Sequence, residues 1–119
     1  MGTTPLKLLL IAGSARDGAL SVRLRDAARR VADGAGAASE VLDLRALALP
    51  LYDGDLEARD GVPAGAAALR DAIAAADAVL IATPEYNGFP TPLLINAFAW
   101  LSRLKDGTTV TADKPVALV

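Results

Sequence analysis

The order of apolar and polar residues along the chain predicts strands that alternate with helices. Residues 6–12 form a nearly continuous apolar run, which is typical of a parallel strand covered on both faces. Shorter apolar runs at 40–44, 78–82 and 115–119 predict three more strands. Because helices between strands make right-handed βαβ units, this order predicts an α/β fold with a doubly wound parallel sheet.

The first helical pattern follows a glycine-containing loop and ends at Gly34 and Gly36. Its apolar positions recur at helical spacing and fall on one face. They are Leu20, Leu24, Ala27, Ala28 and Val31.

Two further helices are predicted, together with one long loop. Residues 64–76 are rich in alanine, and Leu69 and Ile73 are expected to face inward. Residues 93–104 form a helix that is apolar on almost every side. The segment 45–63 mixes proline, glycine and aspartate, so it is expected to be a loop.

The final apolar run falls where a central strand is expected, and a central parallel strand needs cover on both faces. We therefore expect residues 1–119 to be one domain that is incomplete at its C-terminus. A genuine end at Val119 is the alternative.

Composition narrows the class of protein. With 119 residues, 53% of them hydrophobic and 22% charged, the chain can bury a core and is not expected to be disordered. A net charge of −2 argues against a nucleic-acid or polybasic membrane surface. No apolar run near the start is long enough for a signal peptide or a membrane span, so a cytoplasmic location is expected.

Cysteine and histidine are both absent. Their absence excludes disulfides, thiolate or imidazole metal sites, cysteine nucleophiles and histidine-based triads. Chemistry must then come from hydroxyls, carboxylates, Arg or Lys, backbone amides or a bound cofactor. We predict no catalytic side chain and no metal site.

The loop at residues 13–18, Gly-Ser-Ala-Arg-Asp-Gly, lies between the first strand and the first helix. A helix N-terminus at the carboxyl end of a strand suits a phosphate. Ser14 and Ser21 offer hydroxyls and Arg16 a guanidinium. The loop fits neither the G-x-G-x-x-G fingerprint nor the P-loop. The alternative is a plain turn with a capped helix and a solvated Arg16.

The loop at residues 83–88, Thr-Pro-Glu-Tyr-Asn-Gly, follows the third strand. In a sheet of order 2-1-3-4-5 it neighbours the first loop, so both open on one crevice. Pro84 within the loop and Pro90 just after it stiffen the loop. Its polar groups are expected to meet the edge and face of a flat heteroaromatic ring, and a generic turn is the alternative. The residues concerned are Pro84, Glu85, Tyr86, Asn87 and Gly88.

Thr91 is expected to cap the helix that follows, with Pro92 as its first residue. The helix offers more apolar surface than a sheet can cover, which indicates a homodimer or homotetramer contact through residues 92–104. Trp100 is the expected anchor of that contact. A tryptophan buried in the core is the alternative.

These motifs together resemble the NADPH-dependent FMN reductases, a flavodoxin-like family. Residues 13–21 resemble the family's G-S-x-R-x-x-S-x-N phosphate loop, and residues 83–88 its flavin loop. The Asn-x-x-x-Trp-Leu pattern at 96–101 and Leu-Pro-Leu-Tyr-Asp at 49–53 also match. The resemblance extends over essentially the whole chain.

The resemblance implies FMN as cofactor, NADPH or NADH as co-substrate, and homo-oligomers. The phosphate is expected on Ser14, Arg16 and Ser21, and the ring and ribityl chain on residues 84–87. Hydride would pass from NAD(P)H through FMN to a flavin, a quinone or another small acceptor. Ala19 and Ser21 depart from the usual Ser and Asn of the family loop, which removes donors from the phosphate cradle.

Two other functions stay open at this point. One is an FMN-binding electron carrier that does not oxidise NAD(P)H, although the chain's charge is milder than such carriers use for docking. The other is an inactive remnant of the same ancestry.

Overall fold

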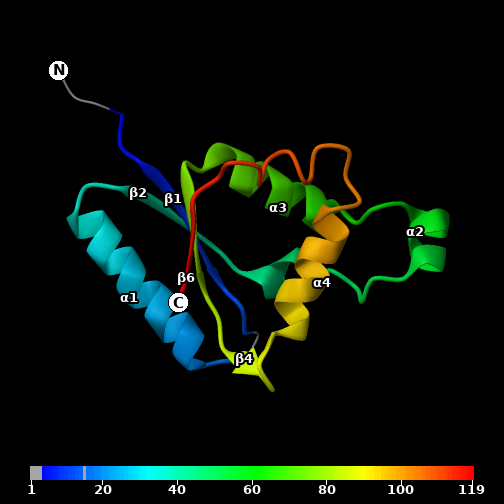
Figure 1. The fold of residues 1–119 in the computed structure, drawn as a ribbon, viewed down its shortest axis with the longest axis horizontal. Helices are drawn as coiled ribbons and strands as arrows, with labels where there is room; N and C mark the ends of the chain where they lie inside the picture. Colours follow the sequence, from blue (N-terminus) through cyan, green and yellow to red (C-terminus); the bar gives the residue numbers. More distant parts are fainter. Residues whose placement is uncertain (1–3, 15) are drawn as a thin grey trace.

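The computed structural model describes residues 4–14 and 16–119. Its main sheet has four parallel strands in the order β2-β1-β3-β6 (Figure 1). The strands are β1 (Lys7–Ala12), β2 (Ala38–Leu42), β3 (Ala78–Ala82) and β6 (Val116–Leu118). With β6 as the fourth strand in chain order, this confirms the α/β class and the first four places of the order 2-1-3-4-5. The described residues contain no fifth strand of this sheet.

Strand β1 is an inner strand of the sheet and is paired on both sides. Leu9 lies opposite Glu40 of β2 and Val79 of β3. Strand β2 begins and ends two residues earlier than predicted. It ends there because the Asp43 carboxylate accepts a hydrogen bond from the N–H of Arg45 and so starts a short 3₁₀ helix, η1 (Leu44–Leu47).

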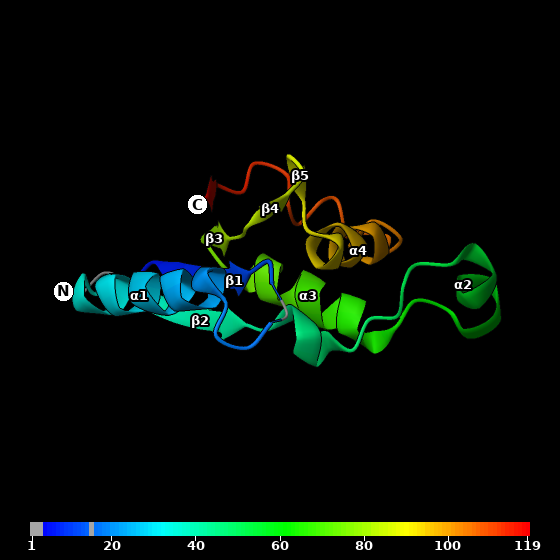
Figure 2. The same ribbon diagram turned by 90° about the horizontal axis from the view of Figure 1, so that it is seen from below.

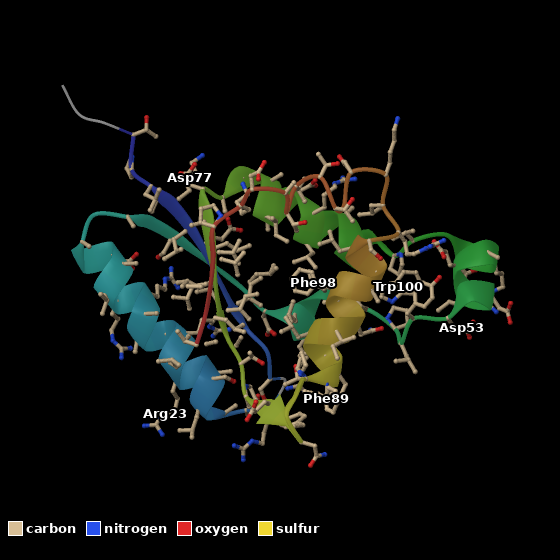
Figure 3. All side chains as sticks on the ribbon, viewed as in Figure 1. Arg23, Asp53, Asp77, Phe89, Phe98 and Trp100 are labelled. Carbon is tan, nitrogen blue, oxygen red and sulfur yellow. The ribbon has the colours of Figure 1, made fainter. Side chains whose placement is uncertain are left out.

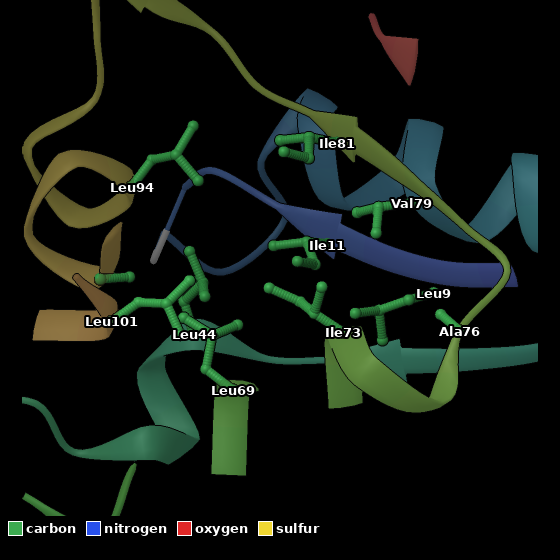
Figure 4. Close-up of a cluster of buried hydrophobic side chains, with 11 residues drawn as sticks. Leu9, Ile11, Leu44, Leu69, Ile73, Ala76, Val79, Ile81, Leu94 and Leu101 are labelled. Atoms are coloured by element: carbon green, nitrogen blue, oxygen red, sulfur yellow. The ribbon is translucent and has the colours of Figure 1, made fainter. Parts of the chain in front are cut away.

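Helices lie on both faces of the sheet. Helix α1 (Leu20–Gly34) packs on one face, and α3 (Ala64–Ala75) and α4 (Pro92–Leu101) lie on the other (Figure 1). Alternate side chains of β1 and β3 meet α3, η1 and α4 in the main hydrophobic core (Figure 4). Its largest members are Leu9, Ile11, Leu44, Leu69, Ile73, Val79, Ile81, Leu94 and Leu101. The inward positions predicted for Leu69 and Ile73 are confirmed.

The apolar residues predicted on one face of α1 do not form a buried face. Leu20 and Val31 are 74% and 73% exposed, and Leu24 is exposed as well. The buried residue of this helix is Ser21, which lies about 100° further round the helix than Leu20. The most buried position of this helix is therefore a small polar residue, which a hydropathy pattern does not mark.

Residues 50–62 form an arm that projects from one end of the molecule in both views (Figures 1 and 2). The sequence predicted a loop here, but the arm contains a short helix, α2 (Gly54–Asp60). The Asp53 carboxylate accepts a hydrogen bond from the N–H of Asp55 and starts the helix. Gly61, with a φ of 79°, ends it.

The second loop forms a two-stranded hairpin, β4 (Glu85–Tyr86) and β5 (Phe89–Pro90), at the carboxyl end of the sheet. After α4 the chain runs through turns from residue 102 to 113 and then enters β6. Within the described ranges, no helix has the length and apolarity needed to cross a membrane.

Candidate functional site

The two loops singled out in the sequence meet at the carboxyl end of the sheet. Ala12 and Ala82 are register partners, so the loops leave neighbouring strands at the same level. The N–H of Gly13 donates to the carbonyl of Ala82 over 2.8 Å. A Cβ on Gly13 would lie 2.1 Å from Oγ1 of Thr83. Glycine at position 13 therefore allows the root of the first loop to lie against the root of the second.

Thr91 makes a further link between the loops. Its hydroxyl donates to the carbonyl of Gly13 over 2.5 Å and accepts from the N–H of Leu94 over 3.2 Å. The second bond confirms Thr91 as the N-cap of α4, and Pro92 is the first helical residue as predicted. Because the residue before a proline favours extended backbone, Pro92 also helps hold Thr91 at its φ of −65° and ψ of 148°.

A cavity of about 270 Å³ opens between the first loop, the start of α1 and the second loop. Five of the eight predicted site residues line it, and they come from both loops. The lining residues are Ser14, Arg16, Ala19, Leu20, Ser21, Pro84 and Tyr86. The structure therefore brings together the predicted phosphate residues and part of the predicted ring loop.

The N-terminal end of α1, at this cavity, has hydrogen-bond donors that no described side chain satisfies. Its N-cap, Ala19, supplies no side-chain hydrogen bond, so the first amides of the helix are uncapped. Ser21 is only 8% exposed, and its Oγ has no partner in the described part of the chain. Arg16 is exposed, and no described carboxylate pairs with it. A helix N-terminus, a buried hydroxyl and a guanidinium around one cavity form a donor set that fits a phosphate.

A second cavity, of about 440 Å³, lies on the other side of Pro84. Because Pro84 lines both cavities, the two are adjacent. Glu85 and Gly88 of the predicted site lie here, and most of the other lining is apolar. The lining residues are Thr83, Pro84, Glu85, Gly88, Phe89, Pro90, Leu94, Leu118 and Val119.

Asn87 lies outside the lining of both cavities. With Gly88 it forms the two-residue turn of the hairpin, where both residues have positive φ, 55° and 79°. This is the pattern of a type I′ turn, for which Asn-Gly is the favoured sequence. The turn accounts for these two residues structurally, and the flavin role predicted for Asn87 stays a prediction. Phe89 projects from the hairpin beside this turn (Figure 3).

Helix α4 holds the arm, which the sequence analysis did not predict. The Asn96 side chain accepts from the N–H of Tyr52 and donates to the carbonyl of Pro50, both over 2.8 Å. Trp100 Nε1 donates to the same carbonyl over 2.7 Å. The motifs at 49–53 and 96–101 therefore bind each other directly. No local sequence signal pairs them, because they lie more than 40 residues apart.

Trp100 is fully buried inside this chain, on the side of α4 that faces the arm (Figure 3). Its expected role as the anchor of a subunit contact is therefore wrong, because its indole N–H and its ring are engaged within the chain. The Tyr52 ring meets it edge-on, with the centroids 4.8 Å apart. An oligomer contact through residues 92–104 stays a prediction, with Ile95 as the apolar residue that this helix exposes.

An ionic cluster secures the arm further along α2. Glu57 accepts hydrogen bonds from Nε of Arg103 at 3.0 Å and from the hydroxyl of Tyr52 at 2.8 Å. These two bonds hold the pKa of Glu57 below its usual value. The bond to Glu57 in turn raises the pKa of Tyr52. Arg103 also lies over the Tyr52 ring, 6.0 Å from its centroid.

Known proteins similar to this chain include quinone and FMN reductases. The quinone reductase of Escherichia coli K12 is 40% identical over 114 residues, which are 95% of this chain and 58% of that protein. An NAD(P)H-dependent FMN reductase of Pseudomonas aeruginosa is 40% identical over 99 residues, covering 82% of this chain and 51% of that protein. The chain thus spans little more than half the length of these relatives.

Solved structures show the same fold. FerB, a flavoenzyme NAD(P)H:(acceptor) oxidoreductase from Paracoccus denitrificans, superposes with a TM-score of 0.76 at 32% identity, covering 96% of this chain and 59% of that one. An azoreductase from Bacillus anthracis gives a TM-score of 0.69 at 22% identity, over 95% of this chain and 67% of that one, and supports the fold alone. The family described as NADPH-dependent FMN reductase matches residues 6–119. The chain therefore belongs to the NADPH-dependent FMN reductase family.

Proposed function

We propose that this chain binds FMN between its two loops and serves as an NAD(P)H-dependent reductase of flavins, quinones or similar small acceptors. One observation carries the proposal. The hydroxyl of Ser21 is buried and has no partner in the described part of the chain, and Ser21 lies in the first turn of α1, whose N-terminus is uncapped, at a cavity shared by both loops. A buried hydroxyl without a hydrogen bond costs about 1–3 kcal/mol, so a ligand that accepts from it is favoured there.

The phosphate half of the ligand would be held by groups of the first loop and of α1. Because the phosphate is ionised, both the guanidinium of Arg16 and the hydroxyl of Ser21 would donate charge-assisted hydrogen bonds to it, and Arg16 adds a positive charge of its own. Ser14 also lines the cavity, and its Oγ already accepts from the N–H of Arg16 over 3.3 Å, which leaves its hydroxyl proton to donate. The helix dipole favours an anion at the same point.

The ring half would lie along the second loop. Pro84 separates the phosphate cavity from the larger, mostly apolar one, and Tyr86 offers an aromatic face at the first. Apolar walls with few polar groups suit a flat heteroaromatic ring and keep water from it. When bound, FMN supplies the hydride chemistry, and the protein's part is to bind and orient it. We therefore assign no acid or base to a side chain.

The test is oxidation of NADPH and NADH by the FMN-loaded chain, with a quinone as acceptor, followed by loss of the nicotinamide absorbance. We expect turnover, with Arg16→Ala losing activity at limiting FMN. Arg30→Ala is the matched control, because it removes the same charge from the exposed face of α1, ten residues beyond its first residue.

Two results would contradict the proposal. A chain that binds FMN and is reduced by dithionite but not by NADPH or NADH would be an electron carrier. A folded chain that binds no FMN would be an inactive remnant. The coenzyme preference and the acceptor follow from the same assay run with each in turn.

A further inference from the structure

Thr91 is one of two buried polar side chains among the described residues, and it differs from the other, Ser21, in having both of its hydrogen bonds satisfied. It is 1% exposed. A buried hydroxyl that both donates and accepts fixes the distance between the groups it joins. Here those groups are the carbonyl of Gly13, at the root of the first loop, and the N–H of Leu94, in the first turn of α4.

The bond to Gly13 controls more than one atom. A peptide bond is planar and trans, so the direction of the Gly13 carbonyl also fixes the direction of the Ser14 N–H. Ser14 is the first residue of the loop to line the phosphate cavity. On its other side, Gly13 is held by the carbonyl of Ala82 and has no room for a Cβ against Thr83. Among the described residues, hydrogen bonds from the end of β3 and from Thr91 therefore hold the start of the first loop.

Thr91 itself has little freedom. Prolines precede and follow it, which fix φ at positions 90 and 92 and restrict the backbone of Thr91. Thr91 lies where the second loop ends and α4 begins, and the start of that loop follows directly after β3. The hydroxyl therefore ties the first loop to a stiff element that also carries the second loop.

We propose that Thr91 is a positioning residue that sets the phosphate half of the cofactor site relative to the ring half. The inference rests on the proposed function. Thr91 lines neither cavity, so it acts through Gly13 and Ser14 rather than on the ligand. Loss of its hydroxyl should release the first loop and weaken the hold on the phosphate more than the hold on the ring.

The experiment compares FMN with riboflavin, which lacks the phosphate, by fluorescence titration of the 119-residue chain. Thr91→Val removes the hydroxyl and keeps the shape, whereas Thr91→Ser keeps the hydroxyl. We expect Thr91→Val to weaken FMN binding by about tenfold, the effect of one lost hydrogen bond, and riboflavin binding much less. Thr91→Ser should keep the wild-type ratio of the two affinities.

Thr91→Val also removes the N-cap of α4, so a control must lose stability at another place. Ile73→Val removes one methyl group from the core on α3, away from both loops, and should leave the affinity ratio unchanged. If Thr91→Val does not fold, Thr91→Cys replaces it, because a thiol is only a weak donor in a side chain of similar size.

The outcomes separate the two proposals. If the wild-type chain prefers FMN to riboflavin and Thr91→Val keeps that preference, or loses both affinities by the same factor, Thr91 has a structural role only and the inference is wrong. If the wild-type chain binds FMN no better than riboflavin, or does not bind FMN at all, the phosphate assignment of the proposed function fails first.

Discussion

Replacing Ser21 with alanine should stabilise the chain without FMN while weakening its hold on FMN. Most substitutions of a buried residue lower stability, so this combination has a specific cause. The Oγ of Ser21 is buried and has no partner in the described part of the chain. Alanine removes that atom, and the hydroxyl is then missing when a phosphate arrives.

The magnitude follows from the burial of one hydroxyl. A buried hydroxyl without a hydrogen bond costs about 1–3 kcal/mol, and alanine is the better helix former by about 0.5 kcal/mol. Part of the gain is offset by the small void that the missing atom leaves, so we expect the free energy of unfolding to rise by about 1–2 kcal/mol. For a chain of 119 residues that raises the melting temperature by about 4 °C per kcal/mol. A lost hydrogen bond to a charged phosphate, about 1.5–3 kcal/mol, weakens FMN binding about ten- to a hundredfold.

Both quantities can be measured on one preparation. Thermal unfolding followed by circular dichroism gives the stability without FMN, and fluorescence titration gives the affinity. Ser102→Ala is the matched control, because that hydroxyl is exposed and already donates to the carbonyl of Ala99. A lower melting temperature for Ser21→Ala, or an unchanged FMN affinity, would refute the proposal that the Ser21 hydroxyl is an unpartnered donor that binds FMN.

Two further predictions concern the arm. Asn96→Ala removes both hydrogen bonds that join its side chain to the arm, so we expect the free energy of unfolding to fall by about 1–3 kcal/mol and limited proteolysis to cut residues 50–62 faster. The pKa of Glu57 is lower in the folded chain than its ordinary value of 4.5. The ionised carboxylate therefore stabilises the fold fully above pH 4.5, and this contribution is lost as the pH falls through the lower folded-state pKa. The difference in melting temperature between wild type and Glu57→Gln should therefore shrink over that range, and the fluorescence of Trp100, the only tryptophan, should report the loosening of the arm.

Ser102→Ala again serves as the control for proteolysis, since it changes α4 without touching the arm. Cleavage of Asn96→Ala at the wild-type rate would show that the arm is held by other contacts. A difference between wild type and Glu57→Gln that stays constant from neutral to acidic pH would show that the ion pair does not stabilise the folded chain.

The sheet could be predicted from the sequence because β1, β3 and β6 are short apolar runs, whereas β2, which contains Ser39 and Glu40, was predicted two residues too late. Strand β3 has the predicted bounds, 78–82, and the predicted order of the first four strands is confirmed. The start of α4 was also predictable, because Thr91 and Pro92 are local signals of a helix N-terminus. These features depend on neighbours in the chain, which is the information a pattern contains.

The missed features depend on distant contacts or on weak local signals. Helix α2 is short and charged and has no apolar stripe, although Asp53 before it and Gly61 after it are start and stop signals that could have indicated it. The burial of α1 did not follow from the pattern, because the period marks a stripe of large apolar residues, whereas the buried residue of this helix is Ser21. The hydrogen bonds between Asn96 and the arm join two segments that only the fold brings together.

The candidate site was predictable in part. The position of both loops at one end of the sheet follows from the strand order, and five of the eight chosen residues line one cavity. Thr91 was chosen only as a helix cap, because its bond to Gly13 spans 78 positions and leaves no trace in either local pattern.

The most direct test of the account is a titration of the folded 119-residue chain with FMN, run beside Arg16→Ala and Arg30→Ala. The account predicts saturable binding of one FMN per chain, an affinity reduced about tenfold or more in Arg16→Ala, and the wild-type affinity in Arg30→Ala. Saturable binding that Arg16→Ala leaves unchanged, or no binding by a chain with native circular dichroism, would contradict a phosphate site at the N-terminus of α1.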